Sequence, residues 1–388
     1  MIYEVYLRNS DGKRGSLVNG IVSLTITFRF NKPVKWVITG SGLEECPIGD
    51  GDEIVVFRDG VTLLCGYEES KKTTYSAKTR IYDWEVTGQS DLGKIERRLV
   101  YPNPAVTPPN PNETYSASGI LSAILLNMID LNAGESAISG VDFSRKLPNL
   151  VISEQEPVGD SVSIESKLED LLSLVQDNLE ATDIQIKEAW DMETGKWDIL
   201  IGNPEDVSDK VIFSVDNGSV SSWERTVTAP KANYLIVTGG KNASDQTMSV
   251  RVEDLDSRDK WGRIEGVVAR SDIKRNEDAG ESWDSVAARL ETAAYEELEK
   301  ASAQFGYKLT IAEVSRNVFL EDYEIGSIVS VRVGGDEFTA KVEEIKITYS
   351  KGVETIVPSV GTMQKGELQT VFTELGTLKE QIKVLQKS

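Results

Sequence analysis

Hydrophobicity alternates with a period of two along the first hundred residues, and this alternation constrains the fold more than any other feature of the sequence. Residues 21–28 (IVSLTITF) place apolar side chains at every second position, which is typical of a strand with one buried face. Residues 53–64 hold two further candidate strands around an Asp-Gly dipeptide, which favours a tight hairpin turn. Short strands joined by glycine-rich turns predict a small β-barrel-like domain over residues 1–101.

A proline-rich stretch interrupts this pattern at residues 102–112. It holds five prolines (PNPAVTPPNPN), which predicts an extended linker. After the linker, the sequence predicts a helix at about 117–131, capped by Ser116 or Ser118, and a second helix at about 163–180. The linker and the two helices set this part of the chain apart from the strands before it.

The region that begins with the linker is predicted to be an α+β insertion over residues 102–230. Residues 184–201 predict a hairpin in which Trp190 and Trp197 pair across the turn. The strands in residues 206–230 fit either this insertion or the first barrel-like domain.

Residues 231–362 return to strands and predict a second β-barrel-like domain. Strand patterns occur on both sides of one long helix at about 282–304, whose apolar residues form a single stripe. The fold class predicted from the sequence is therefore mainly β, with two barrel-like domains, an α+β insertion and, at residues 363–388, a C-terminal coiled-coil helix.

The C-terminal segment carries a heptad repeat without exception over three heptads. The a and d positions are Leu368, Val371, Leu375, Leu378, Ile382 and Leu385. An isolated helix of this length is marginal in water, so the apolar seam predicts association with partner helices. The alternative is a helix that packs on the globular part of the same chain. The residue types at the seam do not fix the number of strands.

Composition excludes several classes of function. The chain has no histidine, which rules out Ser-His-Asp and Cys-His catalysis and imidazole-bound zinc. Its 63 acidic and 42 basic residues give a net charge of −21, and such a surface repels nucleic acid. We expect neither a signal peptide nor a membrane span. Cys46 and Cys65 are expected to be buried thiols, with a pairing across strands as the alternative.

Two acidic runs are the candidates for a cation or catalytic site, residues 49–53 (GDGDE) and 253–259 (EDLDSRD). Carboxylates suit a hard cation such as calcium, but the first run lacks the spaced alternation of a twelve-residue calcium loop. The second has the alternating charges of an exposed loop. We therefore expect solvated turns, and neither a metal, a cofactor nor a catalytic residue.

Five segments give the chain a resemblance to the baseplate hub, or tail-associated, protein family of siphophage tails and related tail-like particles. They are Asp52–Gly60 with Leu64–Gly66, Trp84–Leu92 with Arg97–Pro102, Asn233–Gly240, Asp322–Val331, and the closing Val342–Ile347 with Gly352 and Val360–Gly361. Ser327 stands where the family usually has Asp, and Ile325 where it often has Leu. The order of the segments carries the resemblance, which covers residues 20–362.

The resemblance implies a homotrimer, in which two barrel-like domains per subunit continue a sixfold tail tube down to a threefold tip. It implies a location in the virion, at the tail tip or baseplate, after assembly in the host cytoplasm. The implied partners are adjacent tail-tube or distal-tail proteins, and a tip, fibre or spike protein at the C-terminal helix. An acidic lumen would let DNA or other cargo pass without sticking, because like charges repel.

Two other functions stay open at this point. One is a tail-associated adhesin that binds host cell-surface glycan through residues 101–230. The other is a carboxylate-dependent cell-wall hydrolase, which the lack of histidine and of a paired-acid motif disfavours. The inference to a hub is an analogy at the level of the fold.

Overall fold

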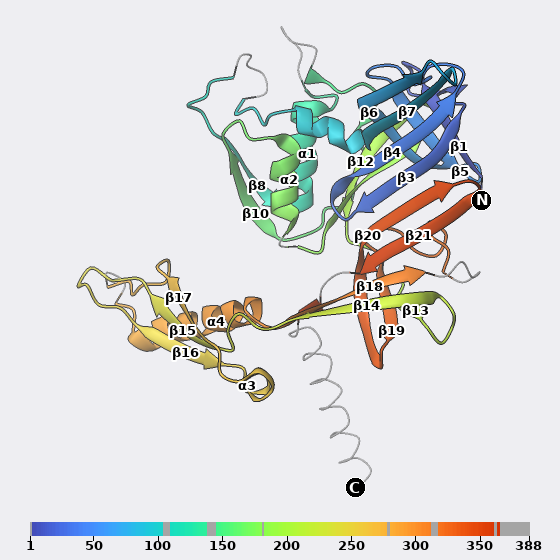
Figure 1. The fold of residues 1–388 in the computed structure, drawn as a ribbon. Coiled ribbons are helices and arrows are strands. Elements are labelled where there is room, and N and C mark those ends of the chain that lie inside the picture. Colours follow the sequence, from blue (N-terminus) through green and yellow to red (C-terminus); the bar gives the residue numbers. More distant parts are fainter. Residues whose placement is uncertain are drawn as a thin grey trace, which may run out of the picture. The chain divides into compact units, whose positions relative to one another are not determined.

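The computed structural model describes residues 2–103, 109–137, 145–180, 182–277, 280–311, 317–360 and 363–364 (Figure 1). The chain forms two compact units. The first holds residues 1–222 and 310–359, and the second holds residues 223–309 with the described residues that follow 359. The domain boundaries predicted at 101, 230 and 362 stay predictions, since compact units and independently folding domains are different properties.

The first unit is built on one long sheet whose strands are antiparallel neighbours (Figure 1). Its order is β21 (Val353–Val360), β20 (Asp336–Ser350), β3 (Ile21–Arg29), β4 (Lys32–Gly42), β7 (Ile81–Ser90), β6 (Val61–Ser76), β5 (Glu53–Arg58), β1 (Tyr3–Arg8) and β2 (Arg14–Leu17). The start of β20 also pairs with β19 (Ile328–Val333), which has β13 (Ile212–Ser214) as a parallel neighbour.

The alternation that opens the sequence is confirmed in β3. Leu24, Ile26 and Phe28 are buried while the residues between them are partly exposed. The Asp-Gly hairpin is also confirmed, because β5 and β6 pair on either side of Asp59 and Gly60, and both residues have positive φ (50° and 82°). Two positive φ values are what a two-residue hairpin turn requires.

Neither of the two predicted barrels is closed among the described strands. No hydrogen-bonded pairing joins β1 or β2 to the other end of the long sheet, and the strands within residues 234–270 form an open three-stranded sheet. Side chains bring the two ends of the long sheet together instead. The ring of Tyr3 in β1 lies 4.7 Å from that of Tyr349 in β20, and Arg58 of β5 pairs with Glu354 of β21. The sheet therefore folds back on itself through side-chain contacts.

The segment between β7 and β13 adds helices and two small sheets to the first unit. After the 3-10 helix η1 (Asp91–Arg97) come β8 (Tyr115–Ile120), α1 (Leu121–Ala133), β9 (Leu150–Val151), β10 (Ser161–Ser166), α2 (Leu171–Glu180), β11 (Gln185–Asp191) and β12 (Lys196–Gly202). Strands β8 and β10 pair with each other, and β12 lies between β11 and β9. The helices and these strands share one buried apolar core.

Both helices predicted here begin later than expected. Ser118 lies in β8 and its hydroxyl bonds to Ser163 of β10 (2.7 Å), so it does not cap α1. Leu168 has a left-handed conformation (φ 57°), which ends β10 and separates it from α2. Asp170 then accepts a hydrogen bond from the Ser173 N–H (2.7 Å), as a helix cap does.

The register of the predicted hairpin is confirmed. Trp190 in β11 lies opposite Trp197 in β12, around a turn that ends at Gly195.

The second unit is a small sheet with a helix on one face (Figure 1). Strand β15 (Tyr234–Gly239) lies between β16 (Ser249–Glu253) and β17 (Glu265–Arg270). The predicted long helix is confirmed as α4 (Trp283–Lys300), which Ser282 caps by accepting from the Ser285 N–H (3.2 Å). Its buried residues Val286, Leu290 and Ala294 pack on Leu235 and Val237 of β15.

The remaining elements of this part of the chain are β14 (Val220–Thr228), α3 (Leu255–Trp261), β18 (Gln304–Ile311) and β22 (Met363–Gln364). Helix α4 ends at Lys300, before the predicted 304, and β18 begins at Gln304. Within the described residues, no helix has both the length and the apolar character to cross a membrane.

Replacement of Gly88 by Ala should destabilise the first unit strongly. A Cβ atom at Gly88 would lie 2.0 Å from the Tyr67 carbonyl oxygen and 2.3 Å from the Trp36 ring, so neighbouring strands would have to shift. We expect a loss of about 3 kcal/mol in the free energy of unfolding, measured by urea denaturation. Gly202→Ala is the control, because a Cβ atom there meets no atom within 4 Å. Equal effects of the two substitutions would contradict this packing.

Candidate functional site

A cluster of charged side chains lies in the first unit, where β1, β5 and η1 meet; Asp91 is fully buried at its centre, whereas Glu53 is 33% exposed. Arg8 donates two hydrogen bonds to the Asp91 carboxylate (2.5 and 2.8 Å), and Lys94 Nζ lies 2.9 Å from the same group. Glu53 contacts both Arg8 and Lys94. Strand β11 contributes Trp190, whose indole N–H donates to Asp91 (3.3 Å). We call these five residues, with Glu188 described next, the buried charge cluster.

Glu188 is the acid of this cluster that has no cation bound to it. Its carboxylate accepts a hydrogen bond from the Leu92 N–H (2.6 Å). Burial, and then the neighbouring negative charge of Asp91, raise the pKa of Glu188 to about 8, although hydrogen bonds from Ser90 and Leu92 act in the opposite direction. This shift favours the protonated form of Glu188 at neutral pH.

Asp91 behaves in the opposite way. Burial alone would raise its pKa, but Arg8 and Lys94 outweigh the burial and hold the pKa of Asp91 below its usual range. One neutral and one ionised carboxyl group therefore lie side by side, as they do in some acid–base sites. Here, however, the oxygens of Asp91 are occupied by Arg8, Lys94 and Trp190, which suits a structural role.

A cavity of about 140 Å³ lies next to Glu188. It is lined mainly by apolar side chains, among them Phe28, Leu92 and Phe319, with Asn31 as one of its polar residues. Pockets that bind small molecules typically have volumes of roughly 300–1,000 Å³, so this cavity is small for a substrate. The site can hold β11 against the main sheet, and it offers little room for chemistry.

A second buried network joins β5 to β21. Arg58 donates to both oxygens of Glu354 (2.8 and 2.9 Å) and to the Phe319 carbonyl (3.2 Å), and Tyr3 donates its hydroxyl to Glu354. The side chains of Arg58 and Glu354 are 8% and 5% exposed. Burial and the Glu354 charge raise the pKa of Tyr3, so this hydroxyl stays protonated and donates.

The first acidic run forms a turn, as expected. Asp52 accepts a hydrogen bond from the Gly49 N–H (2.7 Å), and Asp50 pairs with Lys71. Within the described residues, no group of three or more Cys, Asp and Glu residues is placed to hold a metal ion.

The second acidic run was predicted to be an exposed loop, and this prediction is wrong. It contains the short helix α3, which Asp254 caps by accepting from the Ser257 N–H (2.9 Å), rather than a loop.

The two cysteines are free thiols in the structure. Cys65 is buried, as expected, whereas Cys46 is half-buried. Burial raises the pKa of the Cys65 thiol, which makes it a poor nucleophile.

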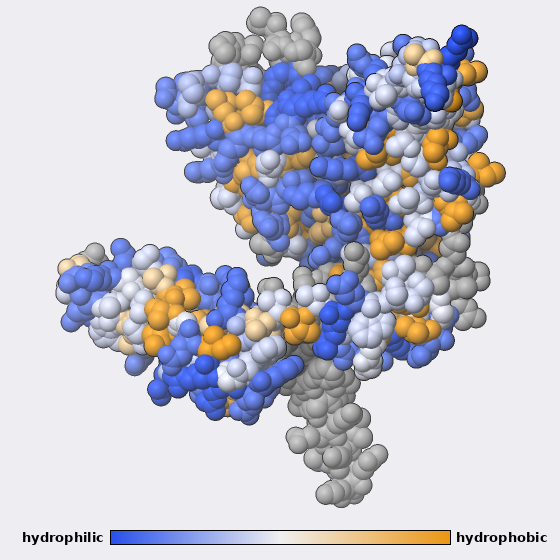
Figure 2. Space-filling view, viewed as in Figure 1, coloured by the Kyte–Doolittle hydropathy of each residue, from blue (hydrophilic) through white to orange (hydrophobic). Residues whose placement is uncertain are grey.

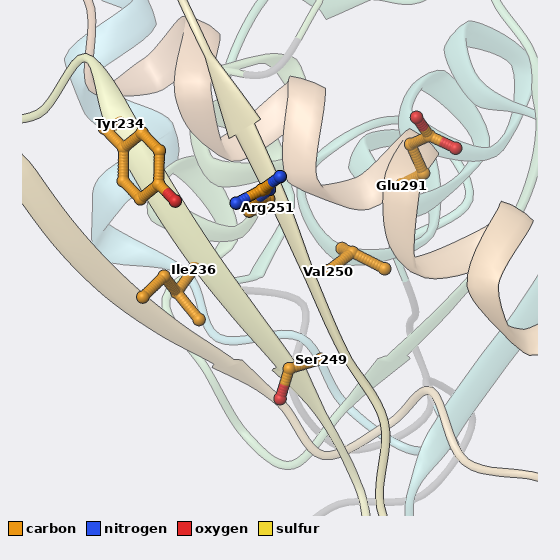
Figure 3. Close-up of a pocket in the computed structure, with 6 residues that line it drawn as sticks. All are labelled: Tyr234, Ile236, Ser249, Val250, Arg251 and Glu291. Atoms are coloured by element: carbon orange, nitrogen blue, oxygen red, sulfur yellow. The ribbon is translucent and has the colours of Figure 1, made fainter.

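The second unit carries a groove of about 500 Å³ along strand β16 (Figure 3). Its lining residues are Tyr234, Ile236, Ser249, Val250, Arg251 and Glu291. Arg263 stacks over the Tyr234 ring at 3.9 Å, whereas Arg251 makes no ion pair within the described residues. Figure 2 shows apolar side chains among the polar surface of this unit.

The coiled-coil seam that the sequence predicts, Leu368 to Leu385, lies outside the described residues. Sequence reasoning missed the buried charge cluster. The signal was present in β11, where Glu188 lies between Ile186 and Trp190 on the face of the strand that alternation assigns to apolar residues.

A family model described as Siphovirus ReqiPepy6 Gp37-like protein matches residues 4–362. Comparison with curated proteins gives no match.

Solved structures of phage tail proteins match almost the whole chain. The 43 kDa tail protein of prophage MuSo2 from Shewanella oneidensis is 12% identical, with a TM-score of 0.56 over 92% of this chain and 97% of that one. A tail protein from Neisseria meningitidis MC58 is 12% identical, with a TM-score of 0.54 over 93% and 97%. Prophage tail protein gp18 from Listeria monocytogenes EGD-e is 9% identical, with a TM-score of 0.52 over 97% and 99%. The chain thus has the fold of phage tail proteins.

Glu188→Gln should change how stability depends on pH. In the folded chain Glu188 keeps its proton up to about pH 8, whereas in the unfolded chain it ionises near about 4.3. The folded state therefore binds more protons between these values, and the stability that Glu188 contributes falls as pH rises through this window. Relative to the native protein, the free energy of unfolding of the variant should rise by up to about 1.4 kcal/mol per pH unit from pH 5 to 8. Urea denaturation at each pH measures this difference.

The matched control is Glu193→Gln, at the exposed turn of the same hairpin. The free energies of unfolding of this variant and of the native protein should differ by the same amount at every pH in this range. Parallel stability curves for Glu188→Gln and the native protein would show that Glu188 is not held neutral.

Proposed function

The chain belongs to the Siphovirus ReqiPepy6 Gp37-like protein family, and from this premise we propose that it is a structural hub of a phage tail tip or baseplate. The observation that carries the proposal is that one family model and the fold of phage tail proteins both extend over nearly the whole chain. No part of the described chain is left over as a separate catalytic module, so the proposal accounts for the chain as a unit.

The proposed hub has no enzymatic role. The acids that lie close together in the first unit are occupied by Arg8, Lys94, Trp190 and backbone N–H groups, so they are unavailable to a substrate. Histidine, the commonest general acid–base residue, does not occur in the sequence. These features fit a structural protein, in which the buried polar groups stabilise the fold.

We propose further that three copies form a ring that joins the tail tube to the tip. The C-terminal seam would bundle the three chains, because apolar a and d positions drive helices to associate. The net charge of −21 supports passage of DNA or other cargo through the ring, since an acidic wall does not attract phosphates.

The proposed partners follow from this position in the virion. The ring would contact adjacent tail-tube or distal-tail proteins on one side. On the other, the C-terminal helix would seat a tip, fibre or spike protein. Assembly would take place in the host cytoplasm.

A double substitution at the seam, Leu375→Asp with Leu378→Asp, tests the trimer. Two charges in an apolar seam should separate the chains, so the mass by light scattering should fall from three times 42.7 kDa to that of one chain. Thr377→Asp is the control, because position 377 lies off the seam and should leave the trimer intact. A native protein that is monomeric at high concentration would count against the ring.

A further inference from the structure

The sheet of the second unit ends in two strands that have a neighbour on one side only. Within the described residues, β16 pairs only with β15, in antiparallel fashion, and β17 pairs only with β15, in parallel fashion. Neither strand contains proline, and Val267 in β17 is 71% exposed. Proteins normally cover or protect such edges, because their unpaired N–H and C=O groups are ready to bind another strand.

The hydrogen-bond pattern identifies the residues that face outward along the β16 edge. Residues 248 and 254 bond through their backbones to the β15 side. Because alternate residues of an antiparallel pair bond to the same neighbour, the backbone groups of Ser249, Arg251 and Glu253 point away from β15.

The same argument applies to the β17 edge. Ile264 and Val268 direct their carbonyl groups to β15. The backbone groups of Glu265, Val267 and Ala269 therefore point outward. The side chains of these outward residues, like those of the β16 edge, are exposed on the sheet face that α4 leaves open.

We propose that the β16 edge of one copy pairs with the β17 edge of the next copy, with Arg251 opposite Glu265. This proposal rests on the proposed ring and names one of its contacts. Strands β16 and β17 run in opposite directions within the sheet, so joining them between copies gives an antiparallel pair and keeps α4 on the same side in both. A contact between two different edges is head-to-tail, which gives a ring when the rotation between copies closes and an open filament when it does not.

Charge selects the register. Outward residues can pair only with outward residues, so alternative registers differ by two positions. With Arg251 opposite Glu265, Ser249 lies opposite Val267. Glu265 pairs with Arg263 of its own chain (2.7 Å), an exposed contact that Arg251 would share. Arg251 itself has no ion pair among the described residues.

A shift by two positions places Glu253 opposite Glu265. Like charges directly opposite each other destabilise a strand pair. The favoured register avoids this contact and places Glu253 opposite Arg263, which precedes β17. Within one chain, Glu253 pairs with Arg258 and Arg263 pairs with Glu265.

The groove along β16 lies on the same face of the sheet as these side chains (Figure 3). The incoming strand would lie outside β16, so the side chain of Glu265 would meet Arg251 from the side opposite to Ile236 of β15. A five-residue pairing buries much less than the roughly 1,600 Å² of a standard interface, so it would be one contact among several in the ring.

Cross-linking of the full-length chain tests the pairing and its register. In a Cys46→Ser background, Ser249→Cys with Val267→Cys should give a disulfide-linked ladder that ends at the trimer on non-reducing gels. A hydrogen-bonded antiparallel pair has Cα atoms about 5.5 Å apart, which suits a disulfide. Within one chain, β15 separates the two positions by two strand spacings, about 9.6 Å, which is too far.

Two sets of variants control for register and charge. Ser249→Cys with Ala269→Cys reports the shifted register and should cross-link at least about tenfold less. Adding Arg251→Glu to the first pair should reduce its cross-linking several-fold, and adding Glu265→Arg to that variant should restore it.

The outcomes separate this inference from the proposed ring. A protein that is trimeric by light scattering but gives no ladder with Ser249→Cys and Val267→Cys overturns the edge pairing and leaves the ring standing. Equal or stronger cross-linking through Ala269→Cys overturns the register. A monomeric protein without cross-links overturns both proposals.

Discussion

The buried ion pair between Arg58 and Glu354 joins β5 to β21, two strands of the first unit that lie far apart in the order of its long sheet. The two residues are 296 positions apart, and their strands are not hydrogen-bonded to each other. The guanidinium binds both carboxylate oxygens, and Tyr3 and the Phe319 carbonyl occupy the remaining polar groups. Removing one partner of such a pair leaves an uncompensated buried charge, which typically costs about 3–5 kcal/mol. Strands β1 and β5 are therefore held against β21 by buried polar side chains rather than by a closed ladder.

Features that depend on neighbouring residues could be predicted from the sequence. The alternation in β3, the turn at Asp59 and Gly60, and the stripe and cap of α4 are all local, and all are confirmed. The start of α2 could not be predicted in this way, because Leu168 adopts a left-handed conformation that its residue type does not favour. Closure of the barrel also failed as a prediction, since it depends on pairings between residues far apart in the chain.

The candidate site was harder to predict than the fold. An acid in a strand is normally on the exposed face, so Glu188 gave no reason to expect burial unless its neighbours Ile186 and Trp190 were weighed together. Asp91 drew attention only as part of a family motif. Its role depends on Arg8 and Lys94, and Arg8 is 83 residues away in the sequence. Charge clusters of this kind are products of tertiary structure, so residue types alone cannot place them.

The two units treat their sheet ends differently, and this difference bears on assembly. In the first unit, side chains of β1 and β5 contact those of β20 and β21, so strands far apart in the order of the sheet pack against each other. In the second unit, β16 and β17 cannot meet because β15 lies between them, and no described strand of the same chain pairs with either outer edge. The edges do have matching directions and opposite charges at Arg251 and Glu265. A strand pair that a single copy cannot make, but that two copies can, turns an unprotected edge into a contact that depends on assembly.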